Sequence, residues 1–110
     1  MANKYLRKYL SPSATTETTI YTVPAANTAI LSSLRVTNGD SSSTILAVKA
    51  YPLGDATAYD LLKDYTLPEG ATMDVFSGVS CVLEATDVLK VTSSQANVDF
   101  YLSYLEVDRS

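Results

Sequence analysis

Two acidic side chains, Asp60 and Asp64, are spaced so that they could serve as an acid–base pair. Paired carboxylates hydrolyse glycosidic bonds when they flank a cleft at a set separation. A third acid, Asp55, lies nearby in the sequence. A chain of 110 residues rarely forms such a cleft alone. We therefore interpret these acids as surface groups that keep the protein soluble.

Other reactive side chains are few. The chain has no histidine and a single cysteine, Cys81, which excludes Ser-His-Asp triads, His-ligated metals and an intramolecular disulfide. Cys81 stands among apolar residues at strand spacing, which is typical of a small buried side chain. Asp40 lies in a Ser-rich turn, but Ca²⁺ takes about six to eight oxygen ligands. We predict no catalytic residue, no metal and no cofactor.

Three tyrosines, Tyr51, Tyr59 and Tyr65, flank the loop around residues 52–58. Tyrosines on the rim of a β-sandwich can anchor a protein interface or stack on sugar rings. They can also cap the core with the hydroxyl in water. We predict Tyr51 and Tyr59 as partner-binding residues, and plain packing and glycan binding stay open as alternatives.

The first ten residues combine apolar and basic side chains. The apolar ones recur at the spacing of one helix face, and the basic ones fall largely on the other side. A helix of fewer than about 12 residues is marginal alone in water, so it would need a surface to dock on. The segment could grip a neighbouring subunit, fray as a terminus, or fold against its own sheet. Its predicted partner-binding residues are Lys4, Tyr5, Leu6, Arg7, Lys8, Tyr9 and Leu10.

Charge divides the chain at a chain-breaking stretch, residues 11–13. The first ten residues hold three bases and no acid, whereas the other hundred hold five bases and twelve acids. We predict a short N-terminal arm over residues 1–13, helical or extended, and one compact domain over residues 14–110. The net charge of −4 argues against a nucleic-acid partner. No apolar run approaches the roughly 20 residues of a membrane span, and we expect no signal peptide.

The body is expected to contain about eight strands. Residues of high β-propensity fill segments between turn signals that recur at intervals of roughly 8–14 residues. This pattern, without a strong helix, predicts an all-β fold, an antiparallel β-sandwich or jelly roll, with a small closed barrel as the alternative. The expected strands cover residues 18–23, 29–37, 44–51, 58–67, 73–76, 79–83, 88–92 and 98–107.

Three details of these strands are specific enough to test. The stretch 38–40 (NGD) is the strongest turn signal and predicts a hairpin between the strands on either side. Alternation places Ile30, Leu34 and Val36 on one face of their strand. Residues 58–67 fit a helical turn or an irregular strand, and we favour a strand with a bulge.

Several stretches resemble small β-sandwich virion proteins of tailed bacteriophages. Each motif is a strand-and-turn pattern, and the order of the motifs is the distinctive part. Together they cover about residues 15–107. The stretches are 18–25 (TTIYTVPA), 29–31 (AIL), 34–38 (LRVTN), 67–72 (LPEGAT), 82–92 (VLEATDVLKVT) and 101–107 (YLSYLEV).

The resemblance implies a non-enzymatic structural protein of the virion, assembled in the host cytoplasm. The chain is too short for a shell-forming capsid protein, so a capsid decoration, or cement, protein that bridges capsomers is the favoured role. A neck, collar or tail-attached protein is the alternative, and a carbohydrate-binding adhesin module is the second alternative. The implied partners are the major capsid protein or other virion proteins, and further copies of the chain, with a trimer favoured.

Overall fold

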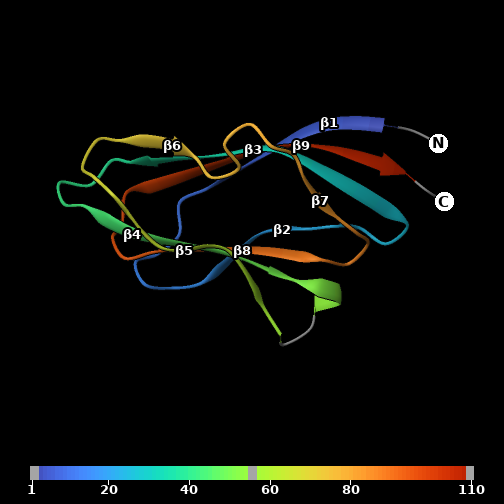
Figure 1. Ribbon diagram of the computed structural model, residues 1–110, viewed down its shortest axis with the longest axis horizontal. Coiled ribbons are helices and arrows are strands. Elements are labelled where there is room, and N and C mark those ends of the chain that lie inside the picture. Colours follow the sequence, from blue (N-terminus) through green and yellow to red (C-terminus); the bar gives the residue numbers. More distant parts are fainter. Residues whose placement is uncertain (1–2, 55–56, 109–110) are drawn as a thin grey trace.

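Two facing β-sheets make up the protein in the computed structural model, which describes residues 3–54 and 57–108 (Figure 1). Three parts of the predictions lie outside the described residues: positions 1–2 of the predicted arm, Asp55 in the loop after residue 52, and the last two residues of the predicted domain. Within the described ranges, no helix is long and apolar enough to cross a membrane.

The five-stranded sheet is built around its two longest strands, β3 and β9. β9 pairs with β1 on one side and with β3 on the other, and the far edge of β3 is shared by β6 and β7. All of these pairs are antiparallel. The strands are β1 (Asn3–Leu10), β3 (Asn27–Asn38), β6 (Thr72–Asp74), β7 (Cys81–Leu83) and β9 (Val98–Asp108).

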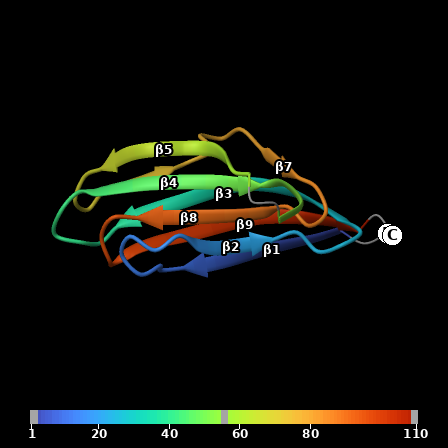
Figure 2. The ribbon, with the colours of Figure 1, turned by 90° about the horizontal axis from the view of Figure 1, so that it is seen from below.

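The four-stranded sheet has the order β2-β8-β4-β5, which Figure 2 shows side by side. Its strands are β2 (Thr18–Thr22), β4 (Thr44–Tyr51), β5 (Tyr59–Leu67) and β8 (Val88–Ser93), and a 3₁₀ turn, η1 (Pro52–Gly54), follows β4. The bulge predicted in residues 58–67 is confirmed. The pairing of β5 with β4 shifts after Leu46, and Asp64 adopts a φ of 50° there.

The chain crosses between the sheets at almost every connection. Only β4–β5 and β6–β7 are consecutive strands within one sheet. Since β6 and β7 share one position beside β3, each sheet has four strand positions, which is the arrangement of a jelly roll. The prediction of an all-β antiparallel sandwich or jelly roll is confirmed.

The helical interpretation of the N-terminal segment is wrong. Residues 3–10 form strand β1, which pairs with β9 from Asn3 opposite Val107 to Leu10 opposite Phe100. The backbone groups on one side of the segment are satisfied by a strand far away in the sequence, which an isolated short helix could not match. The segment therefore folds against its own sheet. The boundary between residues 13 and 14 stays a prediction about domain organisation.

The hairpin predicted at residues 38–40 is also wrong, because β3 and β4 belong to different sheets. Asn38 is fully buried, and its Nδ2 donates to the carbonyl oxygens of Ser42, Leu67 and Pro68 at 2.9, 3.1 and 3.3 Å. Gly39 lies so close to the Asn97 carbonyl that a Cβ there would be 2.9 Å from that oxygen. Residues 38–40 thus lie in a crossing between the sheets. Their contacts tie this crossing to the loop after β5 and to the loop before β9.

A bulge in β3 changes the face on which Ile30 lies. The pairing of β3 with β9 shifts between Leu31 and Ser33. Leu31 and Leu34 are both fully buried, so the positions that point inward change parity across the bulge. Ile30 therefore points outward, and the prediction that it shares a face with Leu34 and Val36 is wrong.

The core fills the space between the two sheets. Strands β3 and β9 contribute the largest share because they lie at the centre of their sheet. Every buried polar side-chain atom of the described residues has a hydrogen-bond partner. The core residues are Ile20, Tyr21, Val23, Ala29, Leu31, Leu34, Val36, Leu46, Val48, Leu67, Leu83, Leu89, Val91, Val98, Phe100, Leu102 and Tyr104.

A polar contact joins the sheets near the chain ends. The Tyr21 hydroxyl on β2 donates to Glu106 Oε2 on β9 at 2.6 Å, and the Tyr21 ring lies 4.3 Å from the ring of Tyr104, centroid to centroid. Burial, followed by the hydrogen bond to Glu106, raises the pKa of Tyr21. Burial also raises the pKa of Tyr104. The fold therefore favours both tyrosines in the neutral form.

The Asn38 hydrogen bonds predict a large effect from a small change. Asn38→Asp removes the Nδ2 donor and places a carboxylate among carbonyl oxygens, so we expect the free energy of unfolding to fall by about 2–4 kcal/mol. The matched control, Asn3→Asp at an exposed position of β1, should change it by less than about 1 kcal/mol. Urea denaturation measures both, and equal losses would contradict the role of Asn38.

The contact between Tyr21 and Glu106 predicts loss of stability at alkaline pH. Because the fold raises the pKa of Tyr21, its contribution is complete below the ordinary tyrosine pKa of about 10 and declines as pH rises above it. Tyr21→Phe should lower stability by about 1–2 kcal/mol at neutral pH and reduce the further decline at high pH. Urea denaturation as a function of pH tests this, with Tyr59→Phe at a 60 % exposed position as the control. An unchanged alkaline slope in Tyr21→Phe would contradict it.

Candidate interaction surface

Strand β1 forms one lateral edge of the five-stranded sheet, and most of it is exposed. Tyr5, Arg7 and Tyr9 point away from the sandwich, because they lie beside outward-facing residues of β9. Tyr5 is 86 % exposed and Tyr9 is 70 % exposed. No other strand among the described residues pairs with the free edge of β1. Two large aromatic side chains are therefore presented to solvent on an edge strand.

The other side of β1 faces the space between the sheets but is poorly covered. Lys4 and Lys8 are exposed there, and Leu6 is 37 % exposed. Leu10 is the one residue of the strand that packs against the core. The seven residues predicted here as partner-binding thus divide between two sides of one strand. Their binding role stays a prediction.

An aromatic stack links β1 to β9. The rings of Tyr9 and Tyr101 lie 5.0 Å apart at an angle of 26°. Arg7 donates through Nε to the Tyr9 hydroxyl at 3.2 Å, and its guanidinium lies 5.6 Å from the centre of the Tyr9 ring. These contacts hold the exposed Tyr9 ring in place against the half-buried Tyr101 ring, so less rotamer entropy would be lost on binding a partner.

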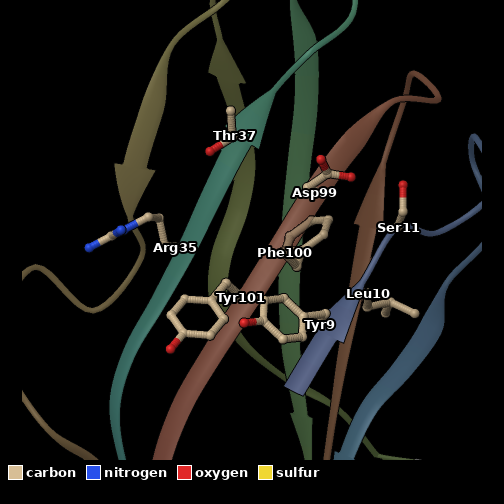
Figure 3. A pocket seen from close by; sticks show the side chains of 8 residues that line it. All are labelled: Tyr9, Leu10, Ser11, Arg35, Thr37, Asp99, Phe100 and Tyr101. Carbon is tan, nitrogen blue, oxygen red and sulfur yellow. The ribbon is translucent and has the colours of Figure 1, made fainter. Parts of the chain in front are cut away.

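A pocket of about 390 Å³ begins beside this stack, where β1 ends. Figure 3 shows the rings of Tyr9 and Tyr101 beside each other, with Arg35, Asp99 and Thr37 reaching from β3 and β9. Aromatic walls with a few polar groups suit the side chain of a protein partner. The remaining lining residues are Leu10, Ser11 and Phe100.

Tyr51 and Tyr59 lie away from β1, on the four-stranded sheet. The Tyr51 hydroxyl donates to Glu17 Oε1 at 2.8 Å, and Lys90 Nζ lies 4.6 Å from the centre of its ring. The hydrogen bond to Glu17 is the main reason that the pKa of Tyr51 is raised. Tyr59 is 60 % exposed at the start of β5. The two tyrosines therefore do not share one surface with the N-terminal residues.

Four apolar side chains form a row across the outer face of the five-stranded sheet, and the sequence singled out only one of them, Tyr5, as a binding residue. In register, Tyr5 pairs with Leu105, Leu105 with Ile30, and Ile30 with Val82. Val82 is 57 % exposed, and Ile30 and Leu105 are half-buried. The available signal was β9, whose residues 100–105 (FYLSYL) are apolar at both parities.

The acidic side chains that were candidates for acid–base catalysis or Ca²⁺ binding lie away from this row. Asp60 and Asp64 line an open surface hollow together with Lys49 and Lys63. Asp40 accepts the Ser42 backbone N–H at 3.1 Å, which is a turn contact. Across residues 3–54 and 57–108, no three metal-ligating side chains gather into a site. Asp60 and Asp64 therefore lie on the open surface, and Asp40 lies in a turn.

Comparison with known proteins shows a shared fold. No family model matches the chain, and no curated protein sequence matches it. Among solved structures, a chain of the Bacillus endospore appendages, which are disulfide-linked pili, has a TM-score of 0.61 and 12 % identity. That similarity covers 99 % of this chain and 88 % of the appendage chain.

Chains of infectious bursal disease virus particles are similar at TM-scores of 0.55 and 0.54, with 10 % and 11 % identity. These similarities cover 97 % and 96 % of this chain but only 35 % and 30 % of the viral chains. The chain therefore spans about a third of the viral proteins it resembles. At such low identity, the comparisons establish a β-sandwich fold of the jelly-roll kind.

Cys81 on β7 gives a chemical prediction. The thiol is free and half-buried, and burial raises its pKa, so less thiolate is present at any given pH than for an exposed cysteine. Alkylation by iodoacetamide at neutral pH should be several-fold slower in the folded protein than in urea. The alkylation rate of the folded protein should also begin to rise at a higher pH than the rate in urea. Rapid labelling of the folded protein at neutral pH would contradict this environment.

Proposed function

We propose that the chain is an accessory structural protein of a bacteriophage virion, most concretely a capsid decoration protein that binds the capsid surface and bridges capsomers. The observation that carries the proposal is β1, an edge strand with seven of its eight residues exposed. The jelly-roll fold, which occurs in chains of virus particles, and the motifs of the sequence add support. The virion would be its location, after assembly in the host cytoplasm.

The proposed mechanism is interfacial. The free edge of β1 offers backbone N–H and C=O groups to a strand or loop of the major capsid protein. Lys4, Arg7 and Lys8 would steer the strand towards an acidic surface, and Tyr5 and Tyr9 would supply apolar contact area. Many copies on one particle would strengthen a weak contact through multivalency. A trimer as the bound unit stays a prediction.

A second candidate function is a subunit of a protein filament. The observation that favours it is the similarity to the endospore-appendage chain, which extends over nearly the whole of both chains. A neck, collar or tail-attached role would use the same β1 surface. The adhesin alternative is less favoured, because the Tyr51 ring is already covered by Lys90 and its hydroxyl is bonded to Glu17.

The decoration proposal predicts the outcome of a binding experiment with purified, undecorated capsids. Tyr9→Ser should weaken binding, and the double variant Lys4→Glu, Lys8→Glu should slow association most strongly at low salt. Point variants are needed because deleting residues 1–10 would remove a whole strand of the sheet. The matched control is Tyr59→Ser on the opposite edge of the sandwich.

Copy number separates the structural roles. Quantitative mass spectrometry of purified virions should find hundreds of copies for a decoration protein and a single ring of copies for a neck protein. Undiminished capsid binding by the Tyr9 and lysine variants, together with weakened binding by Tyr59→Ser, would reject β1 as the contact surface.

A further inference from the structure

The outer face of the five-stranded sheet carries a group of apolar side chains beside its polar ones. An antiparallel sheet with one face in water normally alternates apolar residues inward with polar residues outward. β9 departs from that pattern, because Tyr101, Leu105 and Val107 point outward while their neighbours Phe100 and Leu102 fill the core. β9 is therefore apolar on both faces at these positions, although Ser103 lies between Tyr101 and Leu105.

The apolar row runs across the full width of that face. It begins at Tyr5 on β1, continues through Leu105 and Ile30, and ends at Val82 on β7. The most exposed members, Tyr5 at 86 % and Val82 at 57 %, stand at its two ends. A continuous apolar row open to solvent is typical of a surface that another protein covers.

The outer face of the other sheet gives an internal comparison. At its centre, Lys49 on β4 lies between Lys90 on β8 and Asp60 on β5. Charged side chains thus lie side by side across that face, whereas Leu105 and Ile30 lie side by side on the five-stranded sheet. Of these two rows, only the apolar one would lose its contact with water at little cost.

We propose that this outer face is an isologous interface, on which a second copy of the chain packs its own apolar row to form a dimer. Charge favours a second copy as the occupant. The face carries Arg7 and Arg35 together with Asp74 and Asp99, so its charges balance, although the chain as a whole has a net charge of −4. Two such faces meet without net repulsion. Pairing of two β1 edges would instead bring Lys4, Arg7 and Lys8 close to their own copies.

The area of this outer face also favours a second copy of the chain as the occupant. Four strand positions about 4.8 Å apart, each roughly 30 Å long, give a flat face on the order of 600 Å². The accessible surface of the side chains exceeds that projection and approaches the about 800 Å² per partner of a standard stable interface. A two-fold pair of these faces yields a dimer, in place of the trimer that the sequence favours.

Sedimentation equilibrium and NMR of the full chain test the proposal. The wild type should approach twice its mass of 11.8 kDa as concentration rises, with the largest concentration-dependent shifts at Tyr5, Ile30, Val82 and Leu105. Val82→Lys should weaken dimerisation by at least about tenfold, because a charge would enter the apolar interface. Tyr5→Ser, at a far more exposed position, is a second variant in which the fold is under little strain.

The matched control is Ile45→Lys, which makes the same kind of change at a 49 % exposed apolar residue on the outer face of the other sheet. It should dimerise as the wild type does. A wild type that stays monomeric at every concentration, a trimer, or a dimer lost in Ile45→Lys but kept in Val82→Lys and Tyr5→Ser would each overturn the proposal.

The interface proposal shares Tyr5 with the proposed capsid contact, so Val82→Lys, at the other end of the row, is the variant that separates the two. A monomeric wild type whose capsid binding is lost in Val82→Lys would show that the capsid covers this face, which overturns the second copy as the occupant and leaves the decoration role intact. A dimer with the expected variant effects but no affinity for capsids would support the interface and reject decoration.

Discussion

The structure depends on one register shift in the pairing of β3 with β9. Ala29 and Leu31 point inward before the shift, and Leu34 and Val36 point inward after it. Without the extra residue between Leu31 and Ser33, strict alternation would carry the later apolar residues to the outside and polar ones into the core. The same shift leaves Ile30 on the outer face. The bulge thus sets both the core and the apolar row that faces solvent.

Polar side chains hold the crossings between the sheets, and this explains several acids and amides that carry no chemistry. Asn38 joins its own loop to the loop after β5 at one end of the sandwich. At the other end, the Asp87 carboxylate accepts the backbone N–H groups of Leu53 and Glu84, both at 2.9 Å. These contacts satisfy backbone groups of the loops from within the chain. The β1 edge and the ends of the apolar row stay exposed to solvent.

Local sequence patterns correctly predicted the features that neighbouring residues in the chain determine. The all-β fold, the turns and the bulge in β5 follow from β-propensity and from Gly, Pro and Asn signals within a few residues. The errors came from distant partners. Tyr5 and Tyr9 fit a helix face as well as a strand until the pairing with β9 is known. The NGD turn leads to a crossing because the Asn38 amide bonds to Leu67 and Pro68. The apolar row is assembled from four strands, so no single stretch of sequence displays it.

The five-stranded sheet of this all-β body carries an exposed basic edge strand and an apolar row on its outer face. We propose that the β1 side of this sheet is the surface covered on assembly. Tyrosine iodination of free protein and of purified virions tests it directly, because Tyr5 and Tyr9 lie on that surface and Tyr59 and Tyr65 on β5 do not. The account predicts that Tyr5 and Tyr9 become protected in the particle while Tyr59 and Tyr65 react as before. Protection of the β5 tyrosines, with Tyr5 and Tyr9 still reactive, would contradict it.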